Sequence, residues 1–208
     1  MTLEEARAIY ASHSGGDIDR YNGSGLAGIT EAFYDASGAE KRRIWEVFFT
    51  FALAGDEAEA SLARHFLFNN AAPADAYAPL VAAVRAGGHP NLATIEAILG
   101  AWPANLDDAD RAALTQMFVA NPVAHFALAG NLVRKEPRGP AWDAFALALD
   151  QVSDMNSLVG GYESASLAAR QYDYALILAK RDPALLSELA PLLPSGVGEQ
   201  LLRSAGLP

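Results

Sequence analysis

Residues 37–55 read SGAEKRRIWEVFFTFALAG and carry the clearest helix signal in the chain. Ser37 and Glu40 have the spacing of a capping box, in which each side chain satisfies a backbone N–H of the first helical turn. The apolar residues that follow fall on nearly every side of a helix, which predicts a helix at the buried centre of its neighbourhood. Gly55 then marks the end of that helix.

Similar signals recur on both sides of this stretch. A small polar residue or a proline precedes a run of apolar residues spaced three and four apart, which is the pattern of an amphipathic helix with a capped start. Glycine pairs or further prolines separate these runs. Helix starts are predicted at Thr2 with Glu5, Asp56 with Glu59, Pro73, Asn91, Asp107 or Asp108, Asn121-Pro122 and Asp182-Pro183, with a stop at Gly87-Gly88.

No stretch alternates polar and apolar residues with a period of two, so strands are not expected. From Pro73 onward the helix breakers fall at intervals of roughly 35 residues, as in helical-hairpin repeats. The sequence therefore predicts an all-α fold of about 10–12 helices. We expect an antiparallel helical-hairpin array (a HEAT-like or solenoid-like stack) or an irregular helical bundle. A single domain over residues 1–208 is expected, with the hairpins clearest from 38 to 205.

The composition restricts the function. The 208 residues include no cysteine, which excludes disulfides, thiolate metal sites and cysteine nucleophiles. Twenty-five acidic residues face 15 basic ones, a formal charge of −10. This charge repels nucleic acid and attracts a basic protein partner. The most apolar run, residues 44–54, is far shorter than the roughly 18–20 residues of a membrane span. We expect a cytoplasmic protein, of bacterial type, that does not enter a membrane.

Residues 12–28, SHSGGDIDRYNGSGLAG, form the one long stretch that does not resemble a helix. Residues 23–28 match G-x-G-x-x-G, but a dinucleotide site requires a buried strand before this motif, and none is predicted. Asp17 and Asp19 have the spacing of a calcium loop, which then fails at Tyr21 and Asn22. The stretch is predicted to be a Gly/Asp-rich loop.

None of the four histidines, His13, His65, His89 and His125, has a second ligand at helical spacing. His65 and His125 are expected in apolar helices, where a hydrogen-bonded histidine at the edge of the core is commoner than a catalytic one. No G-x-S-x-G motif occurs. The sequence therefore predicts no catalytic residue, no metal ligand and no cofactor.

Two charged clusters stand out. Lys41, Arg42 and Arg43 lie in the first turns of a predicted helix, where the helix dipole disfavours positive charge. A solvated, salt-bridged face explains them better than a phosphate site. Asp107, Asp108 and Asp110 crowd another helix start, where they favour the dipole and form an acidic contact for a basic partner.

The leading functional hypothesis is a non-enzymatic protein-binding module, within which an inhibitor of the bacterial immunity or antitoxin kind is favoured. The alternative is a small helical enzyme or ligand-binding protein with its site around the 12–28 loop. A third hypothesis is an architectural subunit with Phe68, Trp102 and Trp142 in one exposed patch. The oligomeric state is left open. The candidate binding residues are His13, Asp17, Asp19, Arg20, Tyr21, Asp107, Asp108 and Asp110.

Overall fold

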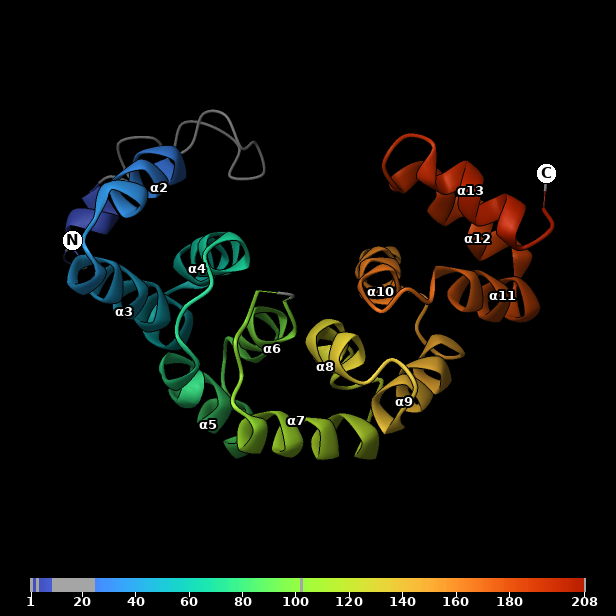
Figure 1. Ribbon diagram of the computed structural model, residues 1–208, viewed down its shortest axis with the longest axis horizontal. Helices are drawn as coiled ribbons and strands as arrows, with labels where there is room; N and C mark the ends of the chain where they lie inside the picture. The colour runs from blue at the N-terminus through green and yellow to red at the C-terminus, as the bar shows by residue number, and fades with distance from the viewer. Residues whose placement is uncertain (1, 3, 9–24, 102, 208) are drawn as a thin grey trace. The chain divides into compact units, whose positions relative to one another are not determined.

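The computed structural model describes residues 2, 4–8, 25–101 and 103–207, with residues 25–28 described by their backbone only. The described residues are predominantly helical and include no strand, which confirms the all-α class (Figure 1). The chain forms two compact units. Unit 1 comprises residues 1–99 and 103–107, and unit 2 comprises residues 100–102 and 108–208. The predicted single domain is not tested by this division and stays a prediction.

Unit 1 holds a short helical segment at residues 4–8 and the elements up to α6. Its helices are α2 (Gly25–Asp35), α3 (Gly38–Ala54), α4 (Glu57–Asn69), the 3-10 helix η1 (Ala74–Tyr77), α5 (Ala78–Ala86) and α6 (Leu92–Gly100), of which Gly100 itself belongs to unit 2.

The core of unit 1 is aromatic and centred on the hairpin of α3 and α4, which lie side by side (Figure 1). Phe48 of α3 stacks on Phe66 of α4 with ring centroids 3.9 Å apart. Phe33 of α2 meets Phe66 edge-on at 5.3 Å, which fastens α2 to the hairpin. Each such aromatic pair adds about 0.5–1.5 kcal/mol beyond the burial of its apolar area. The prediction that α3 occupies the buried centre of its neighbourhood agrees with this packing.

A side chain distant in sequence closes the end of α3. The last carbonyls of a helix have no partner within it. The Asn91 side-chain amide donates to the carbonyl oxygens of Ala52 and Gly55, both at 3.1 Å. Asn91 thus joins the residue before α6 to the end of α3, in addition to marking the start of its own helix.

Unit 2 is a two-layer stack of short helices. Its elements are α7 (Asp108–Ala120), η2 (Phe126–Leu128), α8 (Ala129–Lys135), α9 (Pro140–Leu149), α10 (Met155–Leu167), α11 (Gln171–Arg181), α12 (Pro183–Leu189), η3 (Ala190–Leu192) and α13 (Val197–Ser204). In one layer, α9 packs on α7 and on α11, and α11 also packs on α13. In the other layer, α10 packs on α8 and on α12 (Figure 1). This alternation is that of stacked helical hairpins.

Long polar side chains connect the layers of unit 2. The buried Tyr174 hydroxyl of α11 donates to the carbonyl oxygen of Leu158 in α10 at 2.7 Å. Burial raises the pKa of this phenol above its ordinary value. The Arg170 guanidinium lies 4.2 Å from the ring centroid of Trp142 in α9, a cation–π contact. These contacts fix α11 against both of its neighbours.

Most of the predicted helix ends are confirmed. The capping boxes of Thr2 with Glu5 and of Ser37 with Glu40 are both formed. α5 ends at Gly87, whose φ of +69° is a conformation that glycine adopts without strain. Asp56 and Asp182 accept backbone N–H groups as N-caps.

Two expectations about local structure were wrong. α2 begins at Gly25, so the last four residues of the predicted 12–28 loop are helical. The buried Ile29 and Phe33 supply the packing that extends this helix in spite of its glycines. Asn121-Pro122 does not start a helix either: only one turn forms, from Asn121 O to His125 N at 3.2 Å, and α8 begins later. No side chain from residue 121 to 127 is buried, so no packing extends that turn.

Candidate functional site

The loop residues predicted from the sequence, His13, Asp17, Asp19, Arg20 and Tyr21, lie outside the described part of the chain, as does Trp102. The aspartates near the start of α7 are described. Asp107 and Asp108 are exposed and Asp110 is half-buried. Asp108 pairs with Arg111 three residues later at 2.7 Å, with the Asp108 side chain 99% exposed. An exposed pair of this kind stabilises a helix by only a few tenths of a kcal/mol, about 0.3–0.5, and a binding role for these aspartates stays a prediction.

His65, His89 and His125 are the histidines that the structure describes. His89 accepts the Asn91 N–H through Nδ1 at 3.1 Å, which shapes the turn before α6. His65 is half-buried in α4 as expected, whereas His125 lies in the turn before η2 and not in a helix, a correction that follows from the uncontinued turn at Asn121. Among the described residues, no three His, Asp or Glu side chains are grouped as a metal site would require.

Trp142 does not contribute to the exposed aromatic patch of the third hypothesis, in which Trp102 lies outside the described residues. Trp142 is 5% exposed and lies under Arg170, whereas Phe68 in α4 is 39% exposed. Trp142 therefore belongs to the core of unit 2. No helix in the described ranges combines the length and the apolar character needed to cross a membrane.

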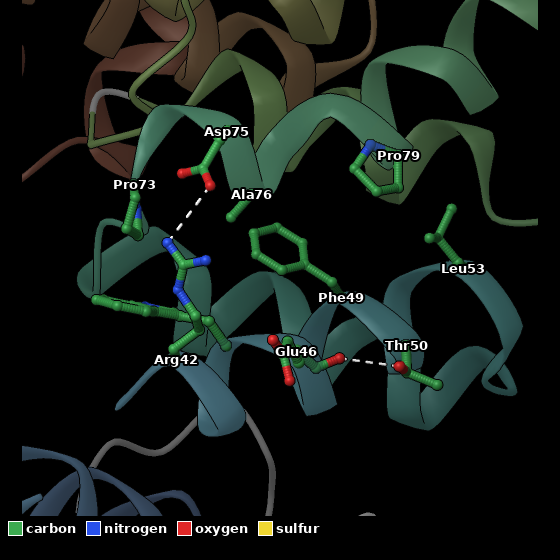
Figure 2. Close-up of a pocket in the computed structure, with 10 residues that line it drawn as sticks. Arg42, Glu46, Phe49, Thr50, Leu53, Pro73, Asp75, Ala76 and Pro79 are labelled. Atoms are coloured by element: carbon green, nitrogen blue, oxygen red, sulfur yellow. Dashed lines mark hydrogen bonds and ion pairs between the residues drawn. The ribbon is translucent and has the colours of Figure 1, made fainter. Parts of the chain in front are cut away.

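A groove of about 360 Å³ lies in unit 1 between α3 and the η1–α5 segment (Figure 2). One wall is a stripe of α3 side chains spaced three and four apart, which places them on one face of the helix. The other wall is the start of η1 and of α5. The lining residues are Arg42, Trp45, Glu46, Phe49, Thr50 and Leu53 from α3, and Pro73, Asp75, Ala76 and Pro79 opposite.

Aromatic packing beneath the groove holds its two walls in place. The buried Tyr77 ring at the end of η1 meets Phe49 edge-on, with centroids 5.3 Å apart. The Tyr77 hydroxyl accepts the Ala72 N–H at 3.1 Å, and burial raises the pKa of this phenol. Trp45 Nε1 donates to the carbonyl oxygen of Asn70 at 3.1 Å. The floor is therefore fixed from both sides.

The groove is apolar at its floor and charged at its rim. Arg42 and Asp75 face each other across it at 3.4 Å, as Figure 2 shows, with side chains 59% and 68% exposed. Such an exposed pair contributes about 0–1 kcal/mol, so it neutralises charge more than it stabilises the fold. Glu46 is exposed, and no ion pair joins its carboxylate to another described residue. The rim thus carries a neutralised pair and one further negative charge.

The lining residues are suited to binding. A volume of this size, mostly apolar with a few polar groups at its edge, is typical of ligand and peptide sites. The one hydroxyl, that of Thr50, donates to the Glu46 carbonyl oxygen at 2.8 Å (Figure 2). No histidine lies beside it to activate it as a nucleophile. The groove therefore offers shape, apolar contact and charge.

The sequence contains one signal for this groove, a second apolar face on α3. Phe49 and Leu53 lie on a different face of α3 from Phe48 and Phe51, so α3 has apolar residues beyond the face that α4 covers. A second apolar face requires a second neighbour or forms a surface for one. Pro73 and Pro79, six residues apart, marked the segment that lies opposite.

Comparisons with known proteins add no relative. No family model matches the chain, no curated protein is detectably similar to it, and no solved structure matches it. Fold and site together define an all-α protein of stacked short helices with an apolar groove in unit 1.

Proposed function

We propose that this protein is a binding module without catalytic chemistry of its own, and that unit 1 engages a basic protein partner. The observation that carries the proposal is the groove between α3 and α5. Its floor is apolar and preformed, its rim is charged, and its single hydroxyl is held by a backbone carbonyl. Such a site supports recognition, and no histidine lines it to activate the hydroxyl as a nucleophile.

The charge distribution supports a basic partner. Unit 1 contains fourteen acidic and seven basic residues, a formal charge of −7, and unit 2 contains eleven and eight, a charge of −3. Both units are acidic, and unit 1 is the more so. A basic protein is steered toward such a surface, and the rate of association then falls as salt screens the field. A nucleic-acid backbone is repelled by the same field.

Within the class of binding modules, an inhibitor is favoured, because a protein that covers the active site of another needs no reactive groups. We infer a bacterial immunity or antitoxin-like inhibitor that acts in the cytoplasm. Its cysteine-free composition is compatible with that compartment.

Affinity purification from the source cells at low salt tests the proposal. We expect one stoichiometric basic protein that is lost in high salt. In the purified complex, hydrogen exchange should show protection of residues 42–53 and 73–79. An empty eluate, or a partner that stays bound in high salt and protects only unit 2, would refute the proposal.

A further inference from the structure

Two apolar side chains of the groove remain accessible to a partner, and a third is buried beneath them. Phe49 is buried at the floor, whereas Leu53 is half-buried and Pro79 is exposed. All three line the same recess (Figure 2). An apolar side chain that entered here would remove accessible apolar surface from water on both molecules, at about 25 cal/mol per Å². Burial of an apolar side chain at this end of the groove would therefore favour binding.

The charged end of the groove determines what lies beside that anchor. Arg42 already neutralises Asp75 across the groove. Glu46 is exposed one turn of α3 from Phe49 and Thr50, and its carboxylate has no ion pair among the described residues. A bound cation would pair with Glu46, whereas a bound carboxylate would meet two like charges and one cation that is already engaged.

We propose that the groove binds a segment of the basic partner in which a large aliphatic or aromatic side chain lies next to a lysine or arginine. The apolar side chain lies against Phe49, Leu53 and Pro79, and the cation pairs with Glu46. This inference rests on the proposed function and adds to it the chemistry of the segment that is recognised.

The Arg42–Asp75 pair allows a test of the charge of the ligand. Replacing Arg42 with glutamine removes a positive charge from the rim and frees the Asp75 carboxylate. If a cation binds here, Arg42→Gln should strengthen its binding. If the groove instead binds an acidic segment, Arg42→Gln should weaken the binding of that segment. The direction of the change therefore identifies the charge of the ligand.

The probe is a set of short acetylated and amidated peptides with a central leucine and one lysine placed in turn at each other position. Matched sets carry glutamine or glutamate in place of the lysine. Binding is followed by NMR of the leucine and alanine methyl groups. We expect the Leu53 and Ala76 methyl signals to shift with at least one lysine peptide. The matching glutamate peptide should give no saturable shift.

Each variant is paired with a control that makes the same substitution at a residue outside the groove. Glu46→Gln should weaken the lysine peptide about two- to five-fold, the range of an exposed ion pair, and leave the glutamine peptide unchanged. Its control is Glu31→Gln, an exposed acid of α2. Arg42→Gln should strengthen the lysine peptide by a similar factor, about two- to five-fold. Its control is Arg43→Gln, which changes the net charge equally but does not line the groove.

The apolar end is tested separately. Leu53→Gln should abolish the methyl shifts of Ala76 with every peptide. Its control is Leu147→Gln, a substitution of a leucine that is 63% exposed on α9 of unit 2, which should leave the shifts intact. Circular dichroism of each variant establishes that the helices are retained.

The outcomes separate this inference from the proposed function. Any one of three results would overturn the inference: no methyl shift with any peptide, equal binding of the glutamate and lysine peptides, or weaker binding of the lysine peptide by Arg42→Gln. Glu46→Gln and Leu53→Gln are also used in the affinity purification. Capture of the basic partner at wild-type levels by both variants would overturn the inference and leave the proposed function standing. Failure of wild-type protein to capture any basic partner would remove the proposed function itself.

Discussion

Two glycines of unit 2 should respond in opposite directions to the same substitution. Gly130 is buried in α8, and a Cβ there would lie 2.5 Å from the carbonyl oxygen of Gly100 and 3.3 Å from Ser164 Oγ. Gly160 is in the interior of α10, and a Cβ there would meet no atom within 4 Å. Alanine is favoured over glycine in a helix by about 1 kcal/mol at either position.

The expected magnitude follows from the space available. Ordinary contact begins at 3.4 Å, so the Gly130→Ala methyl group and the Gly100 carbonyl must separate by about 0.9 Å (3.4 minus 2.5). Because that carbonyl is backbone, no side-chain rotation relieves the overlap. Overpacking of this kind costs about 1–3 kcal/mol, and we expect the upper part of that range. After the gain in helix propensity, Gly130→Ala should be destabilised by about 1–2 kcal/mol and Gly160→Ala stabilised by up to about 1 kcal/mol.

The assay is urea unfolding followed by far-UV circular dichroism, in which an unchanged slope m allows the midpoints to be compared as free energies. Wild type, Gly130→Ala, Gly160→Ala and the double variant are measured together. Ser164 lies beside Gly130, and its hydroxyl donates to the Gly160 carbonyl oxygen at 2.8 Å, so the two sites share a partner and their effects should not simply add in the double variant. If Gly130→Ala is as stable as wild type, or if both variants shift the same way, the close approach at Gly130 does not control the packing of α8.

Two further predictions concern helix ends. Ala169 has a left-handed φ of +56°, so Ala169→Gly should raise the free energy of unfolding by about 0.5–1 kcal/mol in urea, and a lower value would contradict the assigned backbone. Hydrogen bonds from the Ser37 backbone and side chain lower the pKa of Glu40, so its stabilising effect is present above the ordinary glutamate pKa and is lost as pH falls through the lowered value. Ser37→Ala removes the side-chain hydrogen bond and keeps the backbone one, which is the larger cause of the lowered pKa, so this acid limb of the stability curve should become shallower without disappearing. Loss of the N-cap side chain should lower the free energy of unfolding by about 1 kcal/mol at pH 7. An unchanged limb in a pH series of urea midpoints would assign it to other carboxylates.

The all-α class and most helix ends follow from local patterns in the sequence. Caps such as Ser37 with Glu40 and Asp182 with Pro183 depend on hydrogen bonds between residues at most three apart. Periodic apolar residues likewise describe one helix at a time. Both are local properties, so a single chain without relatives is enough to show them.

Packing between distant segments selects which of these local signals form a helix, and it creates the groove. Asn121-Pro122 has the pattern of a helix start, yet no buried side chain follows to extend it. Leu53 and Pro79 line one groove although they are 26 residues apart, because Tyr77 packs on Phe49 and fixes η1 against α3. Packing of this kind depends on shape and burial between segments distant in sequence, which the periodicity of one helix does not specify.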